Sequence, residues 1–214
     1  MLIKEKTSKK HVIEKNDEKE LDVTVEMGIG KLKLSGRSEQ IMEGTFKYRG
    51  DELEPTMDYA KEGEKGTLVI SQKSVSKWGQ FFSAKQDWDF SLNNQLPLSL
   101  CIEIGTGKSE LDLSDLNLQK LSIDAGVGES VIDLTGEWST SFKAEMNTGV
   151  GKTKIILPKK VGARLTLSKG VGKINADYFM MVGDAYQNQA YDDADVKIDI
   201  NLNVGVGEVI LEQV

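Results

Sequence analysis

Apolar and polar residues alternate along several stretches of the chain, and each stretch runs into a pair of glycines. Leu121, Ile123 and Val127 belong to one such stretch. Strict alternation is typical of a β-strand that buries one face. The phase changes at the glycines, because Val127 lies an odd number of positions before the next apolar candidate, Ile132. All of these residues can face a core only if the strand bends or bulges at the glycines.

The glycine pair recurs six times as Gly-x-Gly, starting at Gly28, Gly105, Gly126, Gly149, Gly170 and Gly205. The middle intervals are 21, 23 and 21 residues, and a near-constant period indicates a repeat architecture. The expected fold is therefore all-β: a β-solenoid, or single-stranded β-helix, with rungs of about 21 residues. Turn-like stretches between the copies leave an open antiparallel sandwich as the alternative.

The solenoid prediction places four valines inside the core, stacked in register with their glycines at corners: Val127, Val150, Val171 and Val206. On this interpretation Val150→Asp costs several kcal/mol, because an unpaired charge would enter a dry interior.

The pattern divides the chain into a charged lead-in, residues 1–20, and a single solenoid domain, residues 21–214. Two segments depart from the repeat. Residues 40–97 form an irregular insertion that contains strands around a hairpin turn at "KEGEKG", and residues 178–195 form a long loop.

Charge and motif spacing argue against nucleic acid and nucleotide as partners. The 27 Lys and Arg residues against 34 Asp and Glu give a net charge of −7, and nucleic-acid binding needs clustered cations. The stretch "NTGVGKTKIIL" resembles the end of a phosphate-binding loop, but the required first glycine is replaced by Met146. A short β-branched run ending at Pro158 also stands where that motif needs a helix.

Candidate chemistry is sparse, so we expect no catalytic residues, metal or cofactor. His11 is the only histidine, and the only cysteine, Cys101, is out of phase with its apolar neighbours. Acidic residues cluster at Asp192, Asp193, Asp195 and Asp199 without the glycine and distal glutamate of a calcium loop. Stacked rungs could align two carboxylates for glycoside hydrolysis, which keeps a carbohydrate-active enzyme with an acidic groove as an alternative.

Aromatic side chains gather in one part of the insertion, at Trp78, Phe81, Phe82 and Trp88. Such residues either cap an open end of the stack or anchor a partner. We predict that part of this group is exposed and binds a protein partner or another copy of the chain.

The ordered "GVG…I-x-L" units, "FKYRGDELEP", "DWDFSLNN" and the final "GVGEVIL" resemble the toast-rack domains of bacterial surface proteins over roughly residues 21–214. This group includes the C-terminal region of LiaF-type cell-wall-active-antibiotic response proteins and related adhesin-like proteins. The resemblance implies a fold similar to right-handed β-helices and no catalytic residues. LiaF-type proteins carry transmembrane helices ahead of this domain and restrain a sensor histidine kinase during envelope stress.

These features together predict a non-enzymatic cell-surface or envelope protein that acts through protein contact, in envelope-stress response or adhesion. A self-assembling, bactofilin-like scaffold is the alternative within binding proteins. No stretch approaches the about 20 apolar residues of a membrane span, and the charged start lacks the apolar core of a signal peptide. The resemblance implies an extracytoplasmic location, with membrane association only through a segment outside this chain. The lack of a signal-peptide core keeps a cytoplasmic location as the alternative.

Overall fold

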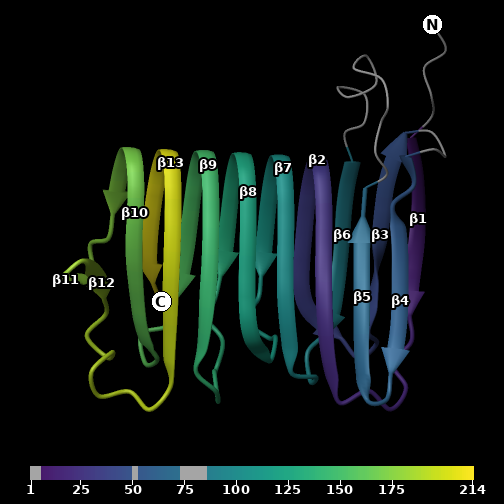
Figure 1. The fold of residues 1–214 in the computed structure, drawn as a ribbon, viewed down its shortest axis with the longest axis horizontal. Helices are drawn as coiled ribbons and strands as arrows, with labels where there is room; N and C mark the ends of the chain where they lie inside the picture. Colours follow the sequence, from purple (N-terminus) through teal and green to yellow (C-terminus); the bar gives the residue numbers. More distant parts are fainter. Residues whose placement is uncertain (1–5, 50–52, 73–85) are drawn as a thin grey trace, which may run out of the picture.

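Six long strands, each folded over at its middle, form the body of the molecule (Figure 1). The computed structural model describes residues 6–49, 53–72 and 86–214. In the view of Figure 1, each long strand runs up one side of the molecule, bends over at the upper edge, and runs down the other side. The six strands are β2 (Glu20–Ser38), β7 (Leu98–Asp112), β8 (Leu118–Asp133), β9 (Phe142–Leu157), β10 (Gly162–Asn175) and β13 (Lys197–Gln213). The all-β prediction is confirmed.

The six strands pair in parallel and in register, in the order β2-β7-β8-β9-β13-β10. Parallel pairing of these strands excludes the antiparallel sandwich for this part of the chain. The order also departs from the sequence, because β13 lies between β9 and β10. Ile200 of β13 is aligned with Ala144 on one side and with Leu165 on the other.

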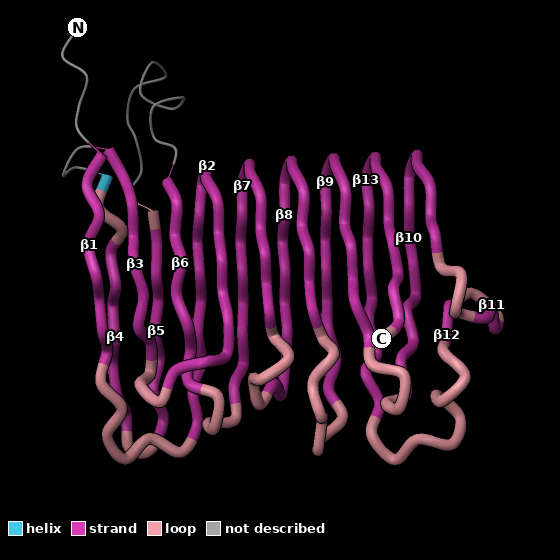
Figure 2. The backbone as a smooth tube through the Cα atoms, turned by 180° about the vertical axis from the view of Figure 1, so that it is seen from behind, coloured by secondary structure: helices cyan, strands magenta, loops and turns pink. Residues whose placement is uncertain are grey.

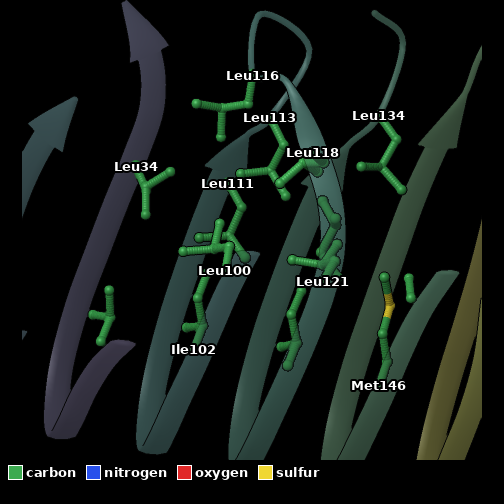
Figure 3. Packing of buried hydrophobic residues seen from close by; sticks show 14 of the residues in the cluster. Leu34, Leu100, Ile102, Leu111, Leu113, Leu116, Leu118, Leu121, Leu134 and Met146 are labelled. Carbon is green, nitrogen blue, oxygen red and sulfur yellow. The ribbon is translucent and has the colours of Figure 1, made fainter. Parts of the chain in front are cut away.

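The core lies between the two halves of the folded strands. In β8, Ile123 before the bend and Ile132 after it are both fully buried, so the inward phase does change at the glycines. Figure 3 shows the same arrangement in β7, where Leu100 and Ile102 from one half lie close to Leu111 from the other. Each such side chain contributes on the order of 2 kcal/mol by leaving water.

A second group of strands covers the outer side of β2. Strand β6 (Gln86–Asn93) runs parallel to the second half of β2, and β5 (Lys65–Ser71) runs parallel to its first half. Antiparallel partners extend both: β3 (Met42–Arg49) pairs with β6, β1 (Lys6–Ile13) with β3, and β4 (Thr56–Glu62) with β5. The segment predicted as an irregular insertion thus contains regular strands, including the expected hairpin.

The charged lead-in also contributes a strand, which its composition does not indicate. Strand β1 reads KTSKKHVI and lies at the edge of the sheet, where charged side chains can face water. At the other end of the stack, the predicted long loop carries a small hairpin of β11 (Met180–Val182) and β12 (Ala185–Gln187), which Figure 2 shows beside β10. None of the described residues forms a helix long and apolar enough to cross a membrane.

Candidate interaction surface

The bends of the long strands depend on their glycines, as β9 illustrates. Gly151 has a backbone φ of +147°, and a Cβ added there would overlap the carbonyl oxygen of Gly128 on the neighbouring strand. Only glycine allows both the positive φ and this close approach. The P-loop-like fragment Gly149–Thr153 therefore lies in the middle of a folded strand and continues into the second half of that strand rather than into a helix.

The residues between the glycines form a line along the bends, which we call the apical ridge: Ile29, Thr106, Val127, Val150, Val206 and Val171. All of them are exposed except Ile29, which is half-buried against Tyr48 and Leu53. The predicted register of the four valines is confirmed, but their predicted burial is wrong. Their exposed fractions are 51, 50, 49 and 70% in ridge order. The middle residue of a fold-over lies on its convex side, so it points to solvent while the alternating positions on either side point inward.

A groove of about 1150 Å³ runs beside the ridge, along the strand halves that precede the bends. Side chains at one register position line it across five strands: Glu26, Glu103, Asp124, Asn147 and Asn203. The Asn203 amide donates to Asn147 Oδ1 at 2.8 Å, and the Asn147 amide donates to Asp124 Oδ1 at 2.6 Å. Hydrogen bonds between neighbouring strands thus fix the positions of the polar groups along half of the groove.

Charged residues occupy the register position that follows the bends. Lys31 and Lys108 are neighbours, and from Lys108 onward the sign of the charge alternates through Glu129, Lys152, Glu208 and Lys173. The Lys108 ammonium lies 2.6 Å from a Glu129 oxygen, and Lys152 lies 3.2 Å from Glu208. The hydrogen bond from Lys108 holds the pKa of Glu129 below its ordinary value. Solvent screens these exposed pairs, so they contribute little to stability, but they select which strands fit side by side.

Comparison with known proteins places this architecture in a family. The model of the N-terminal domain of toast_rack, DUF2154, matches residues 3–156. The chain belongs to this toast-rack family. The match ends within β9, while the toast-rack pattern of glycine-bent strands continues through β10 and β13.

A solved structure is similar to the whole toast-rack chain. It is described as a putative cell adhesion protein from Clostridium sporogenes ATCC 15579, with 29% identity, a TM-score of 0.89, and coverage of 98% of this chain and 100% of that chain. A putative adhesin from Bacteroides fragilis NCTC 9343 matches at 10% identity and a TM-score of 0.28, over 96% of this chain and 97% of that one. Among curated proteins, no sequence matches this chain.

The predicted aromatic patch is corrected at one of its four positions. Trp88 is fully buried in the toast-rack core, where its ring packs against Phe46 with centroids 5.7 Å apart. Its indole N–H donates to Gln86 Oε1 at 2.5 Å. Trp88 alternates inward along β6, so it caps the core at this end of the rack and offers no exposed anchor. Trp78, Phe81 and Phe82 lie outside the described residues.

The single histidine and cysteine of the toast-rack chain occupy structural positions. His11 lies in β1 and makes an edge contact with the Phe46 ring, at 5.6 Å between centroids. Cys101 is half-buried on the outward side of β7, and burial, with the nearby Glu103 carboxylate, raises the pKa of its thiol. A raised pKa opposes the thiolate that a reactive cysteine needs.

Two acidic residues outside the groove, Asp112 and Asp199, pair with separate partners. Asp199 accepts a hydrogen bond from the Tyr191 hydroxyl at 2.7 Å, and Asp112 pairs with Arg37 at 2.5 Å. In the described part of the chain, no group of three or more His, Cys, Asp or Glu side chains is arranged to hold a metal ion. The apical ridge and its groove are therefore the surface features left to explain, and alternation alone failed to find the ridge because it assigned the valines to the core.

Proposed function

We propose that this toast-rack chain is a non-enzymatic protein of the bacterial cell surface or envelope, which acts by contact with another protein in adhesion or envelope-stress response. The apical ridge carries the proposal. Four valines, each about half exposed or more, stand in line on four neighbouring strands. Exposed apolar residues that lie together mark interaction surfaces, and a backbone held by parallel pairing presents them without an ordering cost. The similar Clostridium sporogenes structure, described as a putative cell adhesion protein, supports the same role.

The proposal includes how the ridge is held and where it acts. We infer that the six folded strands work as rungs of a right-handed solenoid within a single domain, residues 21–214, which keeps the ridge straight. The domain lies outside the cytoplasm, and any membrane association comes from a segment outside this chain. Trp78, Phe81 and Phe82 remain a second proposed contact for a protein partner or another copy.

An acidic-groove hydrolase is the alternative that the groove itself raises. Glu26, Glu103 and Asp124 lie side by side at one register position on adjacent strands. Glycoside hydrolysis needs its two carboxyl groups on opposite sides of the scissile bond, about 5–9 Å apart. Neighbours in one register row project from the same face of the sheet, so they approach a sugar from one side. Asp124 is also engaged by Asn147 at 2.6 Å, which favours a binding role over catalysis.

Site-specific photo-crosslinking in the producing bacterium tests the ridge. A photoreactive residue at position 150 should give a discrete adduct in the envelope fraction, which Val206→Ser should weaken at least several-fold. Position 131 is the matched control, because Val131 is also exposed, at 37%, but lies on the outer face of β8, away from the ridge. Equal adducts from both positions, or a chain found only in the cytoplasm, would contradict the proposal. An adduct with the chain itself would favour the scaffold alternative.

A further inference from the structure

The two ends of the stack differ in how the backbone at the last bend is covered. At the β2 end, the Gln72 side chain accepts hydrogen bonds from the backbone N–H groups of Gly28 and Ile29, at 2.8 and 3.0 Å. Strand β6 then pairs with the second half of β2 from Gly30 onward. The neighbouring strand is thus replaced by a side chain at the bend and by β6 beyond it.

At the opposite end, the outer edge of β10 is open. Strand β12 pairs only with Arg164–Thr166, and no other described residue pairs with the outer edge from Leu167 to Asn175. The core is also incomplete here: Leu167 and Ile174 are half-buried, while the aligned Leu202 and Val209 of β13 are each 1% exposed. One backbone acceptor on this edge, the Gly172 carbonyl, is covered by the Lys169 ammonium at 3.3 Å.

Charge limits what can extend this edge. The alternating row that follows the bends ends in Lys173, so the next position outward favours a carboxylate. A second copy fits poorly. Two β10 strands paired antiparallel about Val171 would place Lys169 opposite Lys173, and the free edge strand at the other end, β1, is itself rich in lysine.

Backbone geometry limits the occupant further. A Cβ on Gly172 would overlap the Gly207 carbonyl of the preceding strand, and the same relation holds for the glycines of the inner strands. A strand added outside β10 in the same register therefore needs glycine beside Gly172. The required sequence is a glycine beside Gly172 followed by an acid beside Lys173, while the position beside Val171 is free.

We propose that the edge of β10 from Leu167 to Asn175 docks an extended acidic segment of a partner protein, which adds a parallel strand to the stack. The inference rests on the proposed function, that the chain acts through protein contact, and gives that partner a chemistry. Main-chain hydrogen bonds supply the affinity, the half-buried Leu167 and Ile174 gain cover, and Lys173 selects for a carboxylate.

A peptide with the sequence of residues 122–132, SIDAGVGESVI, is the probe, since it carries Gly128 and Glu129 in the required order. Fluorescence anisotropy should show it binding the intact chain, with at least tenfold loss for the Glu129→Lys peptide. The Gly128→Val peptide should lose as much, which separates strand addition from charge attraction alone. Lys173→Glu in the protein should reverse the preference between the Glu and Lys peptides. Lys173 is exposed but lies beside Glu208, so a cooperative unfolding transition with only a small drop in melting temperature verifies that this variant folds.

Hydrogen exchange locates the contact, because bound peptide should protect amides between Leu167 and Asn175. The inference is overturned if no peptide binds, if Lys173→Glu leaves the preference unchanged, or if protection appears elsewhere. Concentration-dependent dimers that protect β10 without peptide would overturn it in favour of a second copy. If peptide binding fails while ridge adducts at position 150 persist, only the edge inference falls. If the adducts at position 150 are lost while peptide binding is intact, the proposed role of the ridge is contradicted instead.

Discussion

At the bend of each long strand except β2, one position is exposed to solvent and the next has no space for a side chain. In β9, Val150 projects into solvent with half of its surface exposed, while Gly151 has no space for any side chain. The difference follows from the fold-over, which turns one residue to the convex side and presses the next against the neighbouring backbone. The repeated Gly-Val-Gly is thus a backbone requirement that surrounds a free surface position.

Replacing Gly151 by alanine is expected to destabilise the fold by more than about 2 kcal/mol, because both positive φ and overlap with the Gly128 carbonyl penalise a Cβ. Gly63→Ala is the matched control. Gly63 also has positive φ, +60°, but a Cβ there meets nothing within 4 Å, so only the backbone cost of about 1 kcal/mol applies. Urea denaturation measures both. Equal losses would show that the close approach of strands at the bend is unimportant.

Val150→Asp, which the solenoid interpretation expected to be severe, should change the free energy of unfolding by less than about 1 kcal/mol, because position 150 is half exposed. Ile155→Asp, five residues further along the same strand, places a charge in the core and should cost more than about 4 kcal/mol. Thermal and urea unfolding of both variants decide the matter. A large loss for Val150→Asp would mean that the ridge is covered in solution.

The pattern of apolar and polar residues predicts the bends and the strand register, but it places Val150 and Trp88 wrongly for a physical reason. Alternation located the bends and the register, because a change of phase between Ile123 and Ile132 requires a bend. It assigned Val150 to the wrong side, because hydrophobicity does not distinguish a core residue from an apolar residue held at the surface. Trp88 was misplaced in the opposite sense: its aromatic neighbours suggested a surface anchor, while its own alternation with Phe90 along β6 indicated the core.

At the scale of elements, the position of β13 could not be read from the sequence. Its Gly205-Val206-Gly207-Glu208 unit fits beside any strand of the repeat that carries a lysine after the glycines, and both β9 and β10 do. Because the units are nearly identical, several orders of the parallel strands would satisfy the same pairing. The connection through β11 and β12 decides which strands lie beside β13. The longer interval before Gly205 shows only that an excursion exists.

The turn that leads into β2 contains a buried carboxylate, Glu18, with 3% of its surface exposed. Burial acts to raise its pKa, but hydrogen bonds from the Tyr59 hydroxyl and the Asn16 N–H, each 2.7 Å, outweigh it and hold the pKa below the ordinary 4.5. A carboxyl whose pKa is lower when folded stabilises the fold above its unfolded pKa, and that contribution is lost as the pH falls through the folded value.

Glu18→Gln should therefore reduce stability by about 1–2 kcal/mol at pH 7, and the gap to the parent chain should narrow as the pH falls below about 4.5. Urea unfolding at pH 7 and at a series of lower pH values measures the gap. Glu20→Gln changes an exposed carboxylate two residues away and is expected to have little effect at either pH. A gap that stays constant with pH would show that Glu18 contributes no charge-dependent stability.

For the whole molecule, the core of the stack is covered at one end and partly open at the other. At the first end, β6 and β3 cover β2 with a compact aromatic group of Phe46, Trp88 and Phe90. At the other end, β10 keeps a free edge and half-buried core residues. The repeat in the sequence predicts a stack that needs ends, but which end is closed depends on how residues 40–97 pair, and that is visible only once β6 is placed beside β2.

A stack whose strands contact chiefly their neighbours should respond locally to damage at one end. Trp88→Ala removes the largest fully buried side chain and should cost about 3–5 kcal/mol where β3 and β6 pack. In native-state hydrogen exchange, the free energy of opening measured at amides of β1, β3 and β6 should fall by that amount. Amides of β9 and β13 should keep most of their protection. Leu202→Ala, in the middle of β13, is the control and should weaken β9 and β10 while leaving β6 protected. A uniform loss of protection across all strands in both variants would show instead that the two ends unfold as one cooperative unit.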